Sequence, residues 1–331
     1  MKKIIAVLLI LCLAAGMLTG CAGKKTEETA SIRLGGLKGP TTMGMVKLLD
    51  DAENGKTKNS YSYQLAGTAD ELTPKMLRGE LDIIAVPANL GAILHAKSGG
   101  EVQMLAVCTL GVLYLAEKGG EEIGSWEALR GRTVYATGKG ATPEFALRYL
   151  LTQNGLDPDK DVNLVWKSEP TEVVAQMAME ERSCAMLPQP FVTVAKGQLE
   201  NLRVAMDLTE EWNKAGTQGQ LITAGLMVRR TFADEHPEQL QTFLEEYAAS
   251  VQYVNEDSAE AAALVEKYGI VKAAVAEKAI PQCNIVCLTG EEMKTAAEGY
   301  LAVLFEQEPS SVGGALPGES FYRETGKGNQ K

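Results

Sequence analysis

The sequence contains two similar glycine-rich loops, 101 residues apart, and this repetition limits the possible folds. Residues 33–49 read as a short apolar strand, a Gly/Pro/Thr turn and an amphipathic helix, and residues 134–147 repeat this order. The aligned pairs are Lys38 with Lys139, Gly39 with Gly140, Thr41 with Thr142, Lys47 with Arg148, and Leu49 with Leu150. Residues 80–87 align with 181–188 at the same offset. The repetition predicts two similar α/β lobes, each presenting a helix N-terminus to one cleft.

A loop between the end of a strand and the start of a helix is a common site for anions. Backbone N–H groups of the first helical turn are unpaired there, and the helix dipole adds partial positive charge. In the second loop, Thr142 is expected to cap the helix, Pro143 to take its first position and Glu144 to suit its positive end. The repeated loops therefore favour a carboxylate, sulfonate or phosphate ligand.

The N-terminus reads as an export signal. Lys2 and Lys3 precede an apolar run over residues 4–13, and Leu18-Thr-Gly-Cys21 follows. The last four residues resemble the lipobox of bacterial lipoproteins, which implies that residues 1–20 are removed and that Cys21 carries lipid. The alternatives are an ordinary signal peptide or a transmembrane anchor, although the apolar run is short for a membrane span. Lipidation predicts a protein held on the outer face of the bacterial cell membrane, with residues 21–31 as a polar tether.

Length and charge narrow the class of protein. The remaining chain of about 310 residues suits two lobes better than one core, and 45% hydrophobic residues suffice to build them. The formal net charge is −11, and the sequence has no basic stripe. Nucleic acid is therefore not an expected partner.

Strand and helix patterns alternate through the first two thirds of the chain, which predicts largely parallel sheets with helices on both faces. After residue 231 the chain reads as nearly all helical, and residues 310–331 read as a loose tail. The expected strands cover residues 32–34, 61–65, 83–86, 102–107, 111–116, 133–136, 162–166, 184–187, 202–206 and 221–228. The main expected helices cover residues 42–50, 88–97, 142–153, 171–181, 259–268 and 291–305.

Four cysteines fall in the expected lobes. Cys108 and Cys184 lie in apolar runs and read as small buried side chains. Cys283 and Cys287 are close enough in sequence to form a disulfide in an exported protein, or to remain free. A zinc site is not expected, because His95 and His236 are the only histidines and lie far from that pair.

Several segments together resemble one family. These are the lipobox, the first Gly/Pro/Thr loop, Gly79-Glu-Leu-Asp-Ile-Ile and Thr231-Phe-Ala-Asp-Glu-His-Pro-Glu. They are similar to the substrate-binding lipoproteins of ABC importers of the nitrate/sulfonate/taurine class, which includes binders of thiamine-pyrimidine precursors. The resemblance implies the type II periplasmic-binding fold, with two doubly wound lobes, a ligand cleft and two crossovers near residues 113–118 and 219–226. The implied lobes are 32–115 with 221–331, and 116–220.

The expected ligand-binding residues lie where strands end, because open α/β sheets bind ligands there. They are Gly36, Leu37, Lys38, Thr41, Thr42, Gly67, Thr68, Asn89, Thr137, Gly138, Lys139, Thr142 and Gln189. The threonines could equally serve only as helix caps, and the two lysines as solvated loop residues. Asn89 and Gln189 follow Pro87 and Pro188, which end strands, and are candidates for polar ligand contacts.

The expected function is that of a monomeric, non-enzymatic solute receptor that needs no cofactor or metal. Its implied partners are a small molecule and the permease and ATPase subunits of an importer. The helix N-termini and lysines favour an anion such as a sulfonate or carboxylate, whereas a neutral heteroaromatic solute is the alternative. An enzyme on the same fold is disfavoured, because the sequence has no nucleotide or nucleophile motif and no catalytic histidine cluster. A surface sensor or adhesin is the third possibility.

Overall fold

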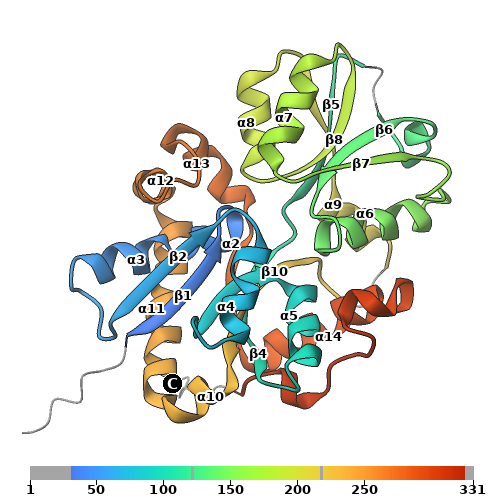
Figure 1. Cartoon of the computed structure of the whole chain (residues 1–331). Helices are drawn as coiled ribbons and strands as arrows, with labels where there is room; N and C mark the ends of the chain where they lie inside the picture. The colour runs from blue at the N-terminus through green and yellow to red at the C-terminus, as the bar shows by residue number, and fades with distance from the viewer. Residues whose placement is uncertain (1–30, 121–122, 217–218, 325–331) are drawn as a thin grey trace, which may run out of the picture. The chain divides into compact units, whose positions relative to one another are not determined.

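The computed structural model describes residues 31–120, 123–216 and 219–324 (Figure 1). The predicted signal peptide, Cys21 and the tether up to residue 30 lie outside the described residues. Within those ranges, no helix is long and apolar enough to span a bilayer.

Two β-sheets organise the described chain. The first sheet has the order β11-β4-β10-β3-β1-β2, and the second has the order β9-β5-β8-β6-β7. The strands of the first sheet are β1 (Ile32–Leu37), β2 (Tyr61–Ala66), β3 (Ile83–Pro87), β4 (Val102–Leu110), β10 (Ile222–Arg229) and β11 (Ile285–Leu288). Those of the second are β5 (Leu113–Lys118), β6 (Thr133–Thr137), β7 (Asn163–Lys167), β8 (Ser183–Pro188) and β9 (Leu202–Asp207). We call the part built on each sheet the first and second lobe.

The two sheets have the same arrangement once β11 is set aside. The strands β1, β2 and β3 pair in parallel, as do β6, β7 and β8. One antiparallel strand then joins each set to an outer strand: β10 lies between β3 and β4, and β5 lies between β8 and β9. The sequence repeat at an offset of 101 residues therefore corresponds to equivalent strands. The chain changes sheet between β4 and β5 and between β9 and β10, while the lobe boundaries at residues 115 and 220 remain predictions.

Helices cover both sheets (Figure 1). In the second lobe, α7 contacts β6 and β8, α8 contacts β8 and β9, and α6 contacts β6. The helices of the second lobe are α6 (Thr142–Gln153), α7 (Pro170–Met179), α8 (Phe191–Gln198) and α9 (Leu208–Lys214). Those of the first lobe are α2 (Pro40–Met43), α3 (Val46–Glu53), α4 (Thr73–Leu77), α5 (Ala88–Lys97), α10 (Arg230–Glu235), α11 (Pro237–Glu256), α12 (Ser258–Lys267), α13 (Ala273–Ala279) and α14 (Gly290–Gln307). Short 3₁₀ turns are η1 (Ala69–Glu71), η2 (Trp126–Leu129), η3 (Ile280–Gln282), η4 (Pro309–Val312) and η5 (Glu319–Phe321).

The helix predicted over residues 42–50 is interrupted in the structure. It is divided into α2 and α3, and Ser250 of α11 explains the break. The Ser250 hydroxyl donates to the carbonyl oxygen of Gly44 at 2.7 Å and accepts the N–H of Leu48 at 3.0 Å. It replaces the direct bond that these two backbone groups would form within a continuous helix.

One expectation for the C-terminal third is confirmed and one is wrong. The described chain after residue 231 is nearly all helical, as predicted, with one short strand, β11, that pairs antiparallel with β4. The predicted loose tail is wrong for its described part, residues 310–324: Phe321 and Tyr322 are buried, and the N–H of Arg323 donates to the carbonyl oxygen of Met104 at 2.8 Å. Residues 325–331 lie outside the described residues. Phe321 also contacts the His95 ring, with centroids 5.2 Å apart. Apolar contacts and a backbone bond to β4 therefore hold this segment.

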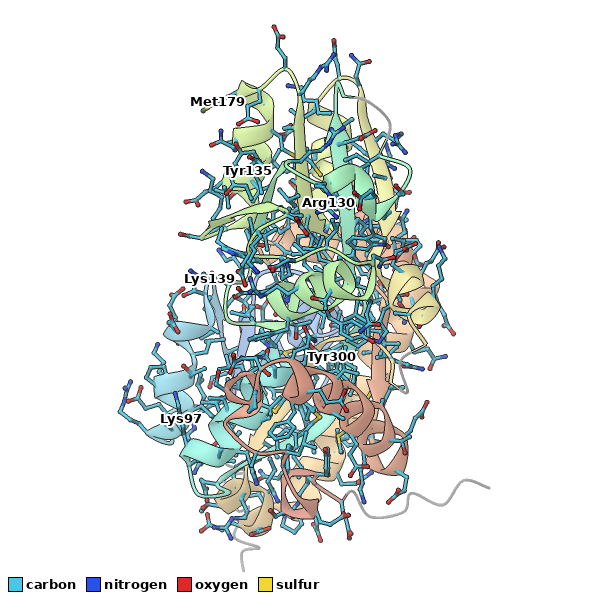
Figure 2. All side chains as sticks on the ribbon, turned by 90° about the vertical axis from the view of Figure 1, so that its right-hand side faces the viewer. Lys97, Arg130, Tyr135, Lys139, Met179 and Tyr300 are labelled. Carbon is cyan, nitrogen blue, oxygen red and sulfur yellow. The ribbon has the colours of Figure 1, made fainter. Side chains whose placement is uncertain are left out.

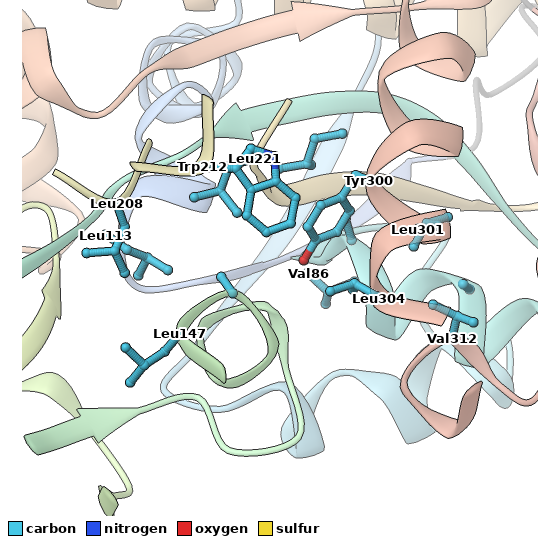
Figure 3. Close-up of a cluster of buried hydrophobic side chains, with 14 of the residues drawn as sticks. Val86, Leu113, Leu147, Leu208, Trp212, Leu221, Tyr300, Leu301, Leu304 and Val312 are labelled. Carbon is cyan, nitrogen blue, oxygen red and sulfur yellow. The ribbon is translucent and has the colours of Figure 1, made fainter. Parts of the chain in front are cut away.

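One hydrophobic cluster includes side chains from both lobes (Figure 3). Trp212 of α9 and Tyr300 of α14 are both 0% exposed, and their ring centroids are 5.9 Å apart. Figure 3 shows these rings beside Leu221, which precedes β10. The Trp212 indole N–H donates to the carbonyl oxygen of Gly219 at 2.7 Å, so the polar group of this buried ring is hydrogen-bonded within the protein. The two lobes therefore share a buried apolar contact near the segments where the chain passes from one sheet to the other.

All four cysteines among the described residues are free thiols. Cys108 and Cys184 are buried, as predicted. Cys283 and Cys287 are both free thiols, and Cys283 lies 3.7 Å from the sulfur of Met43. Within the described ranges, no group of three or more His, Cys, Asp or Glu side chains could hold a metal ion.

Candidate functional site

The loop after β1 is closed by two threonines. The hydroxyls of Thr41 and Thr42 donate to the carbonyl oxygen of Leu37 at 3.0 and 2.5 Å, and both side chains are buried. A β-carbon on Gly36 would lie 2.4 Å from the Thr42 hydroxyl oxygen, so glycine is needed for this close approach. Lys38 is exposed, and its N–H donates to Ala66 at 2.9 Å. The lysine is therefore the polar side chain that this loop presents to solvent.

The loop after β2 is exposed and uses its amides internally. The N–H groups of Gly67 and Thr68 donate to the same Glu71 carboxylate oxygen at 3.1 and 3.2 Å. The contact between Thr68 and Glu71 is a capping box, which satisfies the N-terminus of a short helix. A β-carbon on Gly67 would lie 3.2 Å from a carboxylate oxygen of Glu169, which follows β7 in the second lobe. The two lobes thus approach each other here.

Backbone N–H groups in and after the loop that follows β6 are also hydrogen-bonded to side chains. The N–H of Gly140 donates to the Glu144 carboxylate at 2.6 Å, and the N–H of Thr142 donates to the Asn89 side chain at 3.1 Å. Thr142 is the first helical residue and Ala141 the N-cap, so the predicted capping role of Thr142 is wrong. Its hydroxyl instead accepts a hydrogen bond from Tyr300 at 2.7 Å. The side chains of Glu144 and Asn89 therefore already accept backbone N–H groups at the start of α6.

The remaining residues of this second loop have different environments. Thr137 is 8% exposed, whereas Gly138 is partly exposed and Lys139 is exposed. Gly138 has φ 82° and a β-carbon on it would lie 2.6 Å from the Pro143 ring, so the turn requires glycine. Lys139 is visible at the surface in Figure 2. Neither Lys38 nor Lys139 forms an ion pair with any described residue.

Three loops share a feature that the sequence prediction missed. A glutamate three or four residues further along the chain accepts a loop N–H in each case: Glu71 after β2, Glu144 after β6, and Glu172, which accepts from Ser168 at 3.0 Å, after β7. The first turn of α2, after β1, contains no acidic residue. The Thr68-x-x-Glu71 pattern could have been read from the sequence as a capping box.

Asn89 and Gln189 are fully engaged with protein groups. Asn89 is 0% exposed and connects the start of α5 to the loop after β6 through Thr142 and through Gly140, whose oxygen lies 3.4 Å away. Gln189 is 1% exposed and donates to the side chain of Gln282 at 2.8 Å. The sequence singled out these two side chains as candidates for polar ligand contacts, and that role stays a prediction. It did not reveal that they bond across the lobes.

The predicted residues lie in loops at the ends of parallel neighbouring strands in the two sheets. The loops after β1, β2 and β3 lie at one end of the first sheet, because their strands are parallel neighbours. Asn89 and Gly67 connect this end to the loops after β6 and β7. Gln189 follows β8, the parallel neighbour of β6, and its side chain bonds to Gln282 of η3 in the first lobe.

A cavity of about 770 Å³ lies beside Lys139 on the α6 side of the edge strand β7. Phe145, Arg148 and Trp166 contribute to its wall, together with Gln307 at the end of α14. None of the other predicted site residues is among the described residues that line it. Among the described residues, Lys139 is thus the one predicted site residue that this cavity shares with the loops.

Comparisons with known proteins agree with this geometry. Residues 67–268 match the NMT1-like family. No curated protein sequence matches the chain. An ABC transporter structure from Parabacteroides distasonis has a TM-score of 0.74 and 23% identity, covering 89% of this chain and 99% of that one. The periplasmic aliphatic sulphonate binding protein SsuA from Escherichia coli has a TM-score of 0.72 and 16% identity, covering 91% and 94%.

A more distant neighbour has the same fold. The periplasmic nitrate-binding protein NrtA from Synechocystis PCC 6803 has a TM-score of 0.63 and 13% identity, covering 85% of this chain and 82% of that one. The fold is thus that of type II periplasmic binding proteins, as the sequence resemblance implied.

Proposed function

We propose, because the chain belongs to the NMT1-like family and has the type II periplasmic-binding fold, that it is an extracytoplasmic solute-binding lipoprotein of an ABC importer. Its solute is a small anion such as a sulfonate or carboxylate. It binds this solute without changing it, and delivers it to the permease and ATPase subunits.

The equivalent loops after β1 and β6 carry this proposal. Each presents one exposed lysine, Lys38 or Lys139, and Asn89 connects the two ends of the sheets at which these loops lie. An ammonium group without an ion-pair partner is available for a charge-assisted bond to an anion. Two of the structural neighbours are named for anionic ligands, a sulphonate and nitrate.

Backbone N–H groups that already donate to protein side chains are not free to bind the anion, and this narrows the groups that could bind it. Carboxylates already accept N–H groups in the loops after β2, β6 and β7. The loop after β1 has no acidic residue in the following helical turn. We therefore assign recognition of the negative charge to Lys38 and Lys139, rather than to the N-terminus of α6.

Calorimetric titration with alkanesulfonates, nitrate, carboxylates and pyrimidines tests the solute class. Replacing either Lys38 or Lys139 by Gln is expected to weaken binding of the preferred anion about tenfold, as for loss of one charge-assisted hydrogen bond. Lys97→Gln is the control, because Lys97 is also exposed but lies at the C-terminal end of α5 (Figure 2). Tight binding of a pyrimidine that is insensitive to both substitutions would contradict the anion assignment.

A mass spectrum of the solute after incubation tests the non-enzymatic role. The bound compound is expected to be recovered unchanged and in a 1:1 ratio with the protein. Conversion into a product of different mass would show an enzyme on this fold.

The lipid anchor has a separate test. Metabolic labelling with a radioactive fatty acid is expected to mark the wild-type chain and not Cys21→Ser. Labelling of that variant would contradict the anchor without affecting the solute assignment.

A further inference from the structure

Asn89 and Gln189 follow equivalent strands, β3 and β8, and each reaches into the opposite lobe. Both side chains are almost fully buried, with 0% and 1% of their surface exposed. Their amide groups bond to protein atoms on both sides, so they are positioned to hold the lobes together. The environments of the two amides nevertheless differ.

The bonds of Asn89 are enclosed. Its oxygen accepts the N–H of Thr142 at 3.1 Å, and its nitrogen donates to the carbonyl oxygen of Ser311 at 3.0 Å. The Tyr300 hydroxyl donates to the Thr142 hydroxyl at 2.7 Å, and Asn89, Thr142 and Tyr300 are all 0% exposed. Separating these groups would leave buried donors and acceptors without partners and would open the shared apolar cluster of Figure 3.

The bond that the Gln189 side chain makes to the other lobe ends at an exposed residue. Its nitrogen donates to the oxygen of Gln282 at 2.8 Å, and its own oxygen accepts from Thr193 at 2.8 Å. Gln282 is exposed, and its backbone oxygen accepts a long bond of 3.4 Å from Tyr114. Water can replace Gln189 at Gln282 as the lobes separate, so this bond costs little to break.

We infer a division of roles between the two side-chain amides as the lobes close and open. Asn89 keeps its bonds between the lobes in both states. The bond between Gln189 and Gln282 is present when the lobes are closed and breaks when they open. Both residues are positioning residues, and neither recognises the solute. The inference rests on the proposed function only in that uptake of a solute requires the lobes to open and close.

Hydrogen–deuterium exchange of the full chain in detergent, without solute, tests this division. Gln282→Ala is expected to speed exchange in α8 and α13 about fivefold, while the N-terminus of α6 keeps its protection. Asn89→Ala is expected to speed exchange of the Thr142 amide by about tenfold or more, because that N–H loses its acceptor. Lys278→Ala, on the exposed side of α13, is the control and should change neither region.

Asn89→Asp covers the case in which Asn89→Ala does not fold. It keeps an acceptor for Thr142 but loses the donor to Ser311, so we expect a protected Thr142 amide and faster exchange over residues 309–312. Unchanged protection of Thr142 in Asn89→Ala, or equal acceleration of both regions in Gln282→Ala, would overturn the inference. Because these measurements use no solute, they hold even if the proposed solute class is wrong.

Discussion

The Tyr300 phenol donates a hydrogen bond of 2.7 Å to the hydroxyl of Thr142, and both side chains are fully buried between the lobes. Burial raises the pKa of the Tyr300 phenol, which keeps it a donor near neutral pH.

Tyr300→Phe removes this donor and leaves the ring packing intact. We expect the free energy of unfolding to fall by about 1–2 kcal/mol, as for loss of one buried hydrogen bond. Urea denaturation followed by circular dichroism measures it. Tyr149→Phe is the matched control, because the Tyr149 ring also packs on Trp212, with centroids 4.9 Å apart, but its side chain is partly exposed. Equal losses in the two variants would contradict a specific role for the hydroxyl.

Asp82 makes the stability of the first lobe sensitive to acid. Burial raises the pKa of this carboxyl, but hydrogen bonds from Arg33 at 2.6 Å and Arg229 at 2.7 Å outweigh burial and lower it overall. A lowered pKa stabilises the fold above the ordinary carboxyl pKa, and this contribution is lost as the pH falls through the folded pKa. Wild-type stability should therefore decline below about pH 4.

Asp82→Asn tests this assignment by denaturation at several pH values. At pH 7 the variant should be less stable by about 3 kcal/mol, because two arginines lose a buried partner. The difference in unfolding free energy between wild type and Asp82→Asn should become smaller as the pH falls, because Asp82 itself becomes protonated in the wild type. Glu80→Gln is the control on an exposed pair with Arg78 and should change stability little. A difference that stays constant from pH 7 to pH 3 would contradict the linkage.

Gly36→Ala should distort the loop after β1. The added β-carbon would lie 2.4 Å from the Thr42 hydroxyl, which cannot move without losing its bond to Leu37. We expect a loss of about 1–3 kcal/mol in unfolding free energy. Combining Gly36→Ala with Thr42→Ala removes the clash, so the two changes together should cost less than their sum. Strict additivity in this double-mutant cycle would exclude the contact as the cause.

The four described cysteines, of which Cys287 is partly buried and the other three are buried, should be unreactive in the native state. Burial raises the pKa of Cys108, Cys184 and Cys283 to about 12, and that of Cys287 to about 11. At pH 8 all four remain thiols, which react slowly because the thiolate is the nucleophile. A thiol reagent that forms a coloured product should react with them only after denaturation. Failure of Cys283 and Cys287 to react in denatured, unreduced protein would reveal a disulfide between them.

Much of the fold could be predicted because the apolar patterns are local. The strands around β3 and β8 and the helices α5 and α6 follow from contiguous runs with clear start and stop residues, and the repeat exposed their equivalence. The break at Gly44 depends on a serine 206 residues away, which no local pattern reveals. The burial of Phe321 depends likewise on contact with a distant helix.

The candidate site was harder to predict than the fold. Sequence alone placed Lys38 and Lys139 in equivalent loops, and they occupy such loops in the structure. It could not show that Glu144 accepts the N–H of Gly140 and Asn89 that of Thr142 at the start of α6, because those bonds depend on side-chain direction and on the approach of the other lobe. Whether these loops bind the solute remains a prediction.

The antiparallel strand inside each sheet has a consequence for biosynthesis. β10 ends at Arg229, yet it lies between β3 and β4, which are complete by Leu110. While the chain is being made, those early strands have no neighbour on that side until more than a hundred further residues have been added. The first lobe therefore cannot finish folding co-translationally before the second lobe has been synthesised. A fragment that ends between the lobes would contain β3 and β4 without β10, the strand that joins them in the first sheet.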